Sequence, residues 1–169
     1  MKVEIVQVKT PEEVVSLAEL AKNIWNQHFT PIIGQAQVDY MLKNFQSAEA
    51  IQQQLNDGGE YYLAYVDGER SGYTCLIADQ QSSKMMLSKL YVQSSRRGSG
   101  IGKALLDYAE QRAQMLGMSA LWLTVNRFNE GPVAWYKRQG FAIVDELKKD
   151  IGNGFFMDDF IMQKEIASP

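Results

Sequence analysis

The chain has 169 residues, which suits one domain with a full hydrophobic core, and we expect a single domain over residues 1–169. A net charge of -3 excludes the strongly basic surface of a general nucleic-acid-binding protein. No apolar run approaches the ~18 residues of a membrane span, and the lone Cys75 excludes an internal disulfide. These features predict a cytoplasmic protein that binds neither nucleic acid nor membrane.

The N-terminal third predicts one strand followed by helices. Residues 3–8 alternate loosely between apolar and polar types, which is typical of a strand. Thr10-Pro11-Glu12-Glu13 is a capping box with proline at the first helical position, so a helix is expected to begin there. Ser47 is expected to cap another helix. The helices are expected over 11–27, 35–45 and 48–55, with a looser segment at 28–34.

Strands dominate the rest of the chain. Asp67-Gly68 between two apolar runs predicts a tight hairpin turn. Strands are expected over 61–66, 73–77, 85–92, 120–125, 141–147 and 155–164, and helices over 101–116 and 130–139. This order mixes antiparallel strands with one parallel crossover. It predicts an α+β fold around a single, mostly antiparallel sheet with flanking helices.

A glycine-rich turn joins the strand that ends at Val92 to the helix that begins near Ile101. The first N–H groups of a helix lack partners within it and lie at the positive end of the helix dipole, so such a junction favours anionic phosphates. Arg96, Arg97 and Lys103 add positive charge nearby. The turn lacks the Gly-Lys-Ser/Thr of a P-loop, and its glycines are one residue too close for a dinucleotide-binding fingerprint.

A second motif follows about thirty residues after the turn. Arg97-Gly98-Ser99-Gly100-Ile101-Gly102 fits the pattern Arg/Gln-x-x-Gly-x-Gly/Ala, and Asn129 is followed by Tyr136 seven residues on and by Gly140-Phe141. Together these motifs resemble those of the GCN5-related N-acetyltransferase (GNAT) superfamily, from about Gly59 to Ile166. The resemblance implies a GNAT fold with a splayed parallel strand pair, formed by Lys89–Val92 and Leu121–Val125.

The resemblance also implies a cofactor and a catalytic residue. The loop would hold the pyrophosphate of acetyl-CoA, Asn129 would bind the pantetheine arm, and Tyr136 would protonate the leaving thiolate as general acid. No metal is expected, because no cluster of ligating side chains has metal spacing. The implied cofactor-binding residues are Leu90, Tyr91, Val92, Arg97, Gly98, Ser99, Gly100, Ile101, Gly102, Lys103, Asn129 and Tyr136.

One position departs from the family pattern. Many members carry a glutamate, which deprotonates the acceptor amine, where this chain has Ser88. A serine is not a base at neutral pH. The sequence leaves Glu60, Asp158, Asp159, a water chain or no base at all as alternatives. For Asp158 and Asp159, the simplest interpretation is solvated residues near a hairpin.

The chain is similar to PaiA-type spermidine/spermine acetyltransferases in Trp25–Phe29, in the helices over 38–45 and 51–55, and in the ending Asp159–Lys164. This similarity implies direct acetylation of a primary amine on a small, polyamine-like molecule. The alternatives are a peptide or protein amine as acceptor, or a CoA-binding sensor that lacks catalysis, for which Ser88 is the supporting feature. The family resemblance also implies a homodimer.

Overall fold

The computed structural model describes residues 2–167, and their contacts divide the chain into two compact units. The first unit contains residues 2–77 and 89–109, and the second contains residues 78–88 and 110–167. Within the described residues, no helix is long and apolar enough to cross a membrane.

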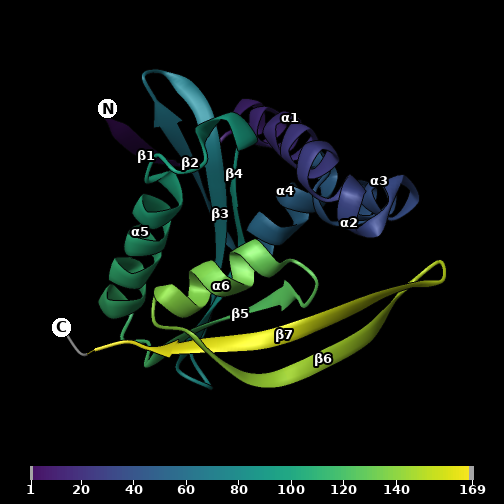
Figure 1. Ribbon diagram of the computed structural model, residues 1–169. Coiled ribbons are helices and arrows are strands. Elements are labelled where there is room, and N and C mark those ends of the chain that lie inside the picture. The colour runs from purple at the N-terminus through teal and green to yellow at the C-terminus, as the bar shows by residue number, and fades with distance from the viewer. Residues whose placement is uncertain (1, 168–169) are drawn as a thin grey trace. The chain divides into compact units, whose positions relative to one another are not determined.

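The first unit contains antiparallel strands and a group of helices (Figure 1). Strand β1 (Val3–Gln7) pairs with β2 (Glu60–Val66), which pairs with β3 (Glu69–Asp79). Asp67 and Gly68 form the predicted β2–β3 turn, with φ of 51° and 82°. The helices are α1 (Pro11–His28), α2 (Thr30–Ile33), α3 (Gln35–Phe45) and α4 (Ala48–Asn56).

The predicted helix starts are confirmed by their hydrogen bonds. Thr10 and Glu13 form both bonds of the capping box at the start of α1, and the Ser47 hydroxyl accepts from the N–H of Ala50 at 3.2 Å at the start of α4. The short helix α2 was not expected in the looser segment. Pro31 lies in its first turn, where a missing N–H costs nothing, so the proline permits this helix.

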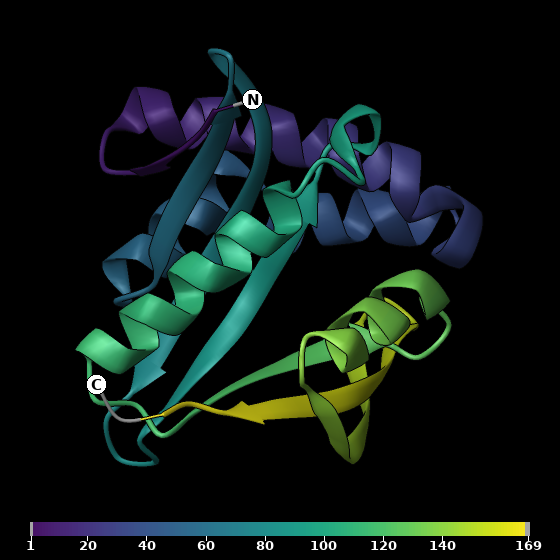
Figure 2. The same ribbon diagram turned by 60° about the vertical axis from the view of Figure 1, so that its left-hand side comes forward.

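The second unit contains a helix and a three-stranded antiparallel sheet. Strand β5 (Ala120–Asn126) pairs with β7 (Phe155–Glu165), which pairs with β6 (Ala142–Gly152). Helix α6 (Glu130–Arg138) precedes β6. Figure 2 shows β5 and α6 beside the β6–β7 hairpin. Strand β6 continues five residues beyond the predicted end at Leu147, because β7 pairs with it as far as Gly152.

Three elements pass from one unit into the other: β3 by its last two residues, β4 (Lys84–Val92) and α5 (Ile101–Met115). The seven strands form one sheet in the order β1-β2-β3-β4-β5-β7-β6, in which β4 and β5 are parallel. This mixed sheet with one parallel pair and flanking helices confirms the predicted fold class.

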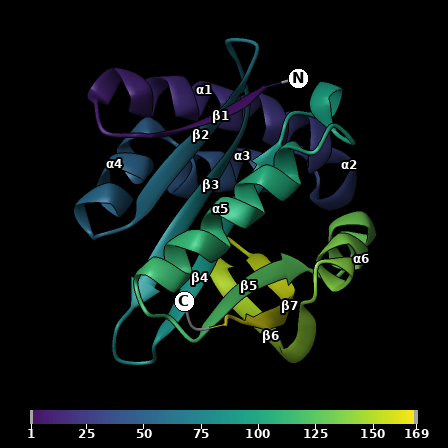
Figure 3. The same cartoon turned by 90° about the vertical axis from the view of Figure 1, so that its left-hand side faces the viewer.

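The core of the first unit lies on both faces of its strands. On one face, α1, α3 and α4 pack their apolar side chains against Leu63, Tyr73 and Cys75. On the other, Ile101 and Leu105 of α5 pack against Ala64 and Val66. Figure 3 shows α5 in front of β2 and β3, with the N-terminal helices behind them. The thiol of Cys75 is buried, as its apolar strand predicts.

Position 72 in β3 requires glycine because there is no space for a side chain. A Cβ at this position would lie 2.8 Å from the backbone oxygen of Tyr91, and 3.2 Å and 3.3 Å from side-chain carbons of Leu105 and Ile101. The backbone oxygen cannot rotate away as a flexible side chain would. Any side chain here therefore pushes β3 away from the end of β4 and from the start of α5.

We predict that Gly72→Ala lowers the free energy of unfolding by about 1–3 kcal/mol, the usual cost of overpacking. Urea unfolding measures this loss. Gly131→Ala is the matched control, because a Cβ at Gly131 in α6 meets nothing within 4 Å. Alanine is the better helix former, so the control should match or exceed the parent stability. Equal stability of Gly72→Ala and the parent would contradict the steric argument.

Candidate active site

The end of β4 is fixed by packing on both faces. Leu90 and Val92 pack against the cluster that contains Ile101 and Leu105. Tyr91 points to the opposite face, where its ring centroid lies 5.4 Å from those of Trp25 and Tyr73. Alternate side chains of a strand point to opposite faces, so three consecutive residues hold this strand end from both sides. The backbone groups of Leu90–Val92 are thereby held in a fixed position.

Lys89 anchors the same strand end through a buried ammonium group. Its Nζ donates to the backbone oxygen of Phe45 at 2.5 Å, to Gln54 Oε1 at 3.0 Å and to the Tyr61 hydroxyl at 2.5 Å. The Tyr61 hydroxyl in turn donates to Gln54 Oε1. Burial lowers the pKa of Lys89 to about 8. This network ties β4 to the α3–α4 junction, and the sequence motifs give Lys89 no role.

The glycine loop after β4 takes up backbone conformations that other residues rarely adopt. Gly98 and Gly100 have φ of 79° and 87°, and a Cβ at either position would meet no atom within 4 Å. The Ser99 hydroxyl donates to the backbone oxygen of Arg96 and tightens the turn between them. Helix α5 begins directly afterwards, with the N–H of Ala104 bonded to Gly100 at 3.0 Å. The loop therefore has an open outer face, and the helix N-terminus adjoins it.

Two of the three cations near the loop form ion pairs within the chain. Arg96 contacts Glu69 at 2.6 Å, and Lys103 contacts Asp107 at 2.5 Å one helical turn on. Arg97 is exposed and pairs with no acidic group of the described residues. The positive potential expected here therefore comes mainly from Arg97 and from the backbone N–H groups at the start of α5.

Asn129 and Tyr136 lie on one face of α6, because seven residues make almost two full turns, about 10 Å along the axis. Both side chains are buried. Asn129 is the N-cap residue of α6, but its side chain forms no capping hydrogen bond, since its backbone has φ of -86° and ψ of 70° rather than the extended conformation of a side-chain cap. Its backbone N–H donates to Asn126 at 2.9 Å.

The ring of Tyr136 is held by aromatic neighbours. It packs edge-on against Trp135 at 5.1 Å and Phe141 at 5.5 Å, and burial raises the pKa of its phenol. Gly140, with φ of 100°, lets the chain turn so that the N–H of Phe141 donates to the Tyr136 backbone oxygen at 3.0 Å. The Gly-Phe that closes the motif thus fixes the tyrosine ring.

Asp159 is buried, and the expectation of a solvated side chain is wrong. It lies on β7 directly opposite Asn126 of β5 and Leu147 of β6, and only 5% of the residue is exposed. Burial raises its pKa to about 6, and a hydrogen bond from Thr124 partly opposes that shift. No ion pair of the described residues includes Asp159.

The other two candidate carboxylates are already engaged. Asp158 accepts from Arg127 Nε at 2.7 Å, and Arg127 also contacts Glu146 at 3.0 Å. Glu60 accepts from the Tyr62 hydroxyl at 2.6 Å. Of the three candidate carboxylates, Asp159 alone is buried and forms no ion pair with the described residues.

The pairing of β4 with β5 is short. Within the second unit it runs from Lys84 opposite Ala120 to Met86 opposite Trp122, and β5 continues to Asn126. The last residues of β5 thus extend beyond the parallel ladder. On its opposite edge, β5 pairs with β7 as far as Asn126.

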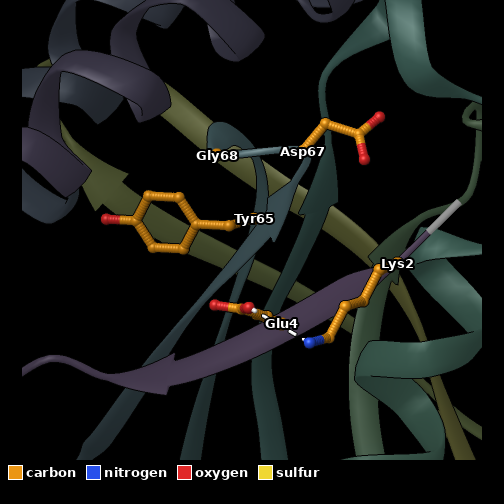
Figure 4. A pocket seen from close by; sticks show the side chains of 5 residues that line it. All are labelled: Lys2, Glu4, Tyr65, Asp67 and Gly68. Atoms are coloured by element: carbon orange, nitrogen blue, oxygen red, sulfur yellow. Dashed lines mark ion pairs between the residues drawn. The ribbon is translucent and has the colours of Figure 1, made fainter.

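The predicted residues are distributed over both units. The first unit carries Leu90–Val92 and the loop Arg97–Lys103, and the second carries Asn129 and Tyr136. In residues 2–167, no group of three or more His, Cys, Asp or Glu side chains is arranged to hold a metal ion. A small pocket in the first unit lies elsewhere (Figure 4). It contains none of these residues and is lined by Lys2, Glu4, Tyr65, Asp67 and Gly68.

Comparison with known proteins decides the family. Residues 19–141 match the model of the acetyltransferase (GNAT) family. The chain belongs to the GNAT acetyltransferase family. The matched segment contains both the glycine loop and the Asn129–Tyr136 helix, so the two motifs that resemble this family lie within the match.

Relatives of this GNAT protein include N-acetyltransferases of bacteria and archaea. An uncharacterized N-acetyltransferase of Lactobacillus delbrueckii is 28% identical over 65% of this chain and 66% of its own length. A spermidine N(1)-acetyltransferase of Thermoplasma acidophilum is 25% identical over 99% of this chain and 100% of its own. The chain spans 66%, 46% and 54% of the lengths of the first three curated relatives that it matches.

A solved structure agrees with this assignment. The crystal structure of the PaiA N-acetyltransferase from Thermoplasma acidophilum, in complex with coenzyme A, is 26% identical and covers 98% of this chain and 99% of its own, with a TM-score of 0.79. The GNAT fold of this chain is thus shared with a protein that binds coenzyme A.

The buried ammonium of Lys89 gives a prediction about stability. Its pKa is about 8 in the folded protein and about 10.4 in an unfolded chain, so between these pH values the unfolded state binds more protons at this site. The Lys89 contribution to the free energy of unfolding should therefore rise with pH in this window, by at most about 1.4 kcal/mol per pH unit. Lys89→Met removes the titrating group.

Urea unfolding at pH 8.0, 8.75 and 9.5 tests this contribution. The free energy of unfolding of the parent, minus that of Lys89→Met, should increase across the series. Taking this difference cancels the titration of every other group, including the buried tyrosines, whose pKa values are raised. Parallel pH profiles for the two proteins would show that Lys89 keeps an ordinary pKa in the fold.

Proposed function

We propose that this protein transfers the acetyl group of acetyl-CoA directly to a primary amine of a small, polyamine-like molecule. The observation that carries the proposal is the junction of β4, the glycine loop and α5, with Gly98 and Gly100 in left-handed conformations, in a chain of the GNAT family. Similarity over nearly the whole chain to a spermidine N(1)-acetyltransferase supports the class of acceptor.

The residues of the first unit fit the phosphate-bearing end of coenzyme A. At Gly98 and Gly100 a Cβ would stand in open space, so the backbone is accessible from the side where a phosphate would approach. Gln93, which directly follows Val92, has a buried side-chain oxygen with no hydrogen-bond partner among the described residues. This oxygen can accept from an amide N–H of the ligand. The proposed binding residues are those of the sequence analysis, Leu90–Val92, Arg97–Lys103, Asn129 and Tyr136.

Acetyl-CoA, when bound, supplies an activated acetyl thioester. The chain's own residues then have three tasks: to remove a proton from the acceptor ammonium, to stabilise the carbonyl oxygen as it becomes negative, and to protonate the departing sulfur. Backbone N–H groups at Leu90–Val92 are proposed for the second task. No covalent bond to the protein is needed, because the amine attacks the thioester directly.

Tyr136 is proposed as the general acid. Its phenol is buried and has a raised pKa, so it remains protonated at neutral pH and can give its proton to a thiolate as negative charge develops. Its hydroxyl forms no hydrogen bond with another described residue. The ring is held by Trp135 and Phe141, which restricts where the proton can be delivered.

Asp159 is proposed as the general base in place of the glutamate that Ser88 replaces. With a pKa of about 6, the carboxylate is ionised at pH 7.5 and is more basic than an ordinary aspartate. Asp158 is held by Arg127 and is less suited to this role. The protons balance as follows: the ammonium gives its first proton to Asp159, which later releases it to solvent, and Tyr136 gives a proton to the sulfur. The second proton leaves the nitrogen as the amide forms and restores the Tyr136 phenol.

The remaining expectations belong to the same proposal. We propose a single catalytic domain over residues 1–169, acting in the cytoplasm as a homodimer. The rival function is a CoA-binding module without catalysis, which the serine at position 88 favours. A peptide or protein acceptor is the rival substrate class.

The release of free CoA thiol from acetyl-CoA, measured with a panel of amines, tests the proposed function. The panel contains spermidine, spermine, aminoglycosides, amino acids and short peptides. We expect turnover with the polyamines. Turnover with peptides alone would overturn the substrate class. Binding of acetyl-CoA without turnover on any member would favour the CoA-binding module.

Two variants separate catalysis from binding. Tyr136→Phe should lower kcat by about 10²–10⁴-fold, the usual effect of removing a general acid, and leave acetyl-CoA affinity nearly unchanged. Gly100→Val should weaken acetyl-CoA binding, because a side chain there blocks the backbone and is strained at φ of 87°. Steady-state kinetics and calorimetry measure the two effects. Equal losses of binding in both variants would show that Tyr136 has a structural role.

The proposed base gives a pH prediction. For the parent, kcat/KM should fall as the pH drops through about 6, because Asp159 becomes protonated. In Asp159→Asn this acid limb should disappear, and turnover at pH 7.5 should fall by about 10²-fold or more. Asp158→Asn is the matched control. It should keep the limb, moved slightly to lower pH, because Asp158 raises the pKa of Asp159. An unchanged profile in Asp159→Asn would exclude it as the base.

A further inference from the structure

Strand β6 forms a long, exposed edge of the sheet. It is the last strand in the sheet order and has eleven residues, and among the described strands it pairs with β7 alone. Every residue from Ala142 to Glu146 is exposed, and so are Lys148–Asp150. Figure 1 shows β6 and β7 as an extended two-stranded arm. The free edge of such a strand presents backbone N–H and C=O groups that another strand can pair with.

The regular part of this edge is bounded by two irregularities. The β6–β7 register shifts between Ile143 and Asp145 and again between Asp150 and Gly152. Between them, residues 145–150 pair one to one with β7. A regular segment of this length suits a short antiparallel ladder, and the irregular ends limit how far such a ladder extends.

The charges of this segment are symmetric about Leu147. Asp145 and Glu146 precede it, and Lys148 and Lys149 follow it. When two copies of the segment run antiparallel with Leu147 opposite Leu147, Glu146 faces Lys148 of the other copy and Asp145 faces Lys149. Directly opposite residues lie on the same face, so all four pairs are between opposite charges. Ile143 and Ile151, four residues away on either side, extend the symmetry with apolar residues.

We propose that β6 is the dimer interface of this protein, formed by antiparallel pairing with β6 of a second copy about a two-fold axis at Leu147. The occupant is a second copy because the charge pattern complements itself. A two-fold dimer uses the same patch on both subunits, so each contact occurs twice. The sheets of the two copies are then joined edge to edge.

The neighbouring registers are excluded by charge. A two-fold axis perpendicular to the sheet requires one residue to face its own copy. Centring on Glu146 places that carboxylate opposite itself and Asp145 opposite Leu147. Centring on Lys148 places two ammonium groups together and sets Glu146 opposite Asp150. Like charges directly opposite one another destabilise a strand pair, so only Leu147 provides an attractive arrangement.

The contacts that the charged side chains of β6 make within one chain are compatible with the proposed pairing of β6 with β6. Glu146 contacts Arg127, but its side chain is still 60% exposed, and Arg127 is shared with Asp158. Lys148 lies over the ring of Phe156, which is itself 49% exposed. Val144 is 56% exposed beside the segment. These apolar groups lose contact with water when a second copy covers the edge.

Two charge-reversed chains test the interface. The first carries Asp145→Lys and Glu146→Lys, and the second carries Lys148→Glu and Lys149→Glu. In a homodimer of either variant, each of the four cross-strand pairs around Leu147 joins two like charges and is repulsive. In a heterodimer of the two, every pair is attractive. Sedimentation equilibrium over a range of protein concentrations, with circular dichroism as the check on folding, measures assembly.

We expect the parent to dimerise, more weakly at high salt because the pairs are exposed. Each variant alone should show a dissociation constant raised at least tenfold, and an equimolar mixture should recover dimers. Lys22→Glu with Lys43→Glu, which changes the charge equally on exposed helix positions, should dimerise like the parent. A parent that is monomeric at all concentrations, or variants that dimerise unaided, would overturn the proposal.

The equimolar mixture of the two variants keeps the test decisive if one of them is partly misfolded. Dimers are recovered in it only when the two β6 strands pair as proposed. The proposal does not depend on the acetyl transfer. Measuring CoA release with the same variants separates the two: loss of dimers with retained turnover supports the interface and leaves the proposed activity intact.

Discussion

The position at which β4 ends is the constraint on which the proposed site depends. Gly72 lets the backbone of β3 approach the Tyr91 oxygen to a distance that excludes any side chain. Lys89 holds the strand from the other side through three hydrogen bonds. A buried ammonium is costly unless its donors are satisfied, and here the Lys89 ammonium has three acceptors. The rigid strand end then determines where the glycine loop and α5 begin.

Backbone and side chains divide the proposed chemistry between them. In this proposal, phosphate recognition falls to backbone N–H groups and to Arg97, because Arg96 and Lys103 are paired with Glu69 and Asp107. Proton transfer falls to two side chains whose pKa values burial has raised, Tyr136 and Asp159. Burial favours the protonated phenol and makes the carboxylate a stronger base. The same physical effect therefore suits one group to donate a proton and the other to accept one.

The β6–β7 arm contrasts with the rest of the sheet. The sheet has two edge strands, of which β1 has five residues, whereas β6 has eleven and is exposed along most of its length. Charged residues on an edge strand usually prevent association with other chains. Here their order around Leu147 makes the edge repel most strands and attract a second copy of itself. Specificity then arises from the order of the charges and needs no large apolar surface.

Most of the elements, the fold class and the family could be predicted from the sequence, whereas the short helix α2 and the full length of β6 could not. Local signals sufficed for the predicted features: the capping box at Thr10, the Asp67-Gly68 turn and the spacing of Asn129, Tyr136 and Gly140 depend on residues close together in the chain. The folded structure was needed to show that Asp159 is buried, that Lys89 lies within a hydrogen-bond network, and that the Asn129 side chain forms no capping hydrogen bond. Burial and ion pairing depend on residues distant in sequence, and a linear pattern does not encode which of them meet.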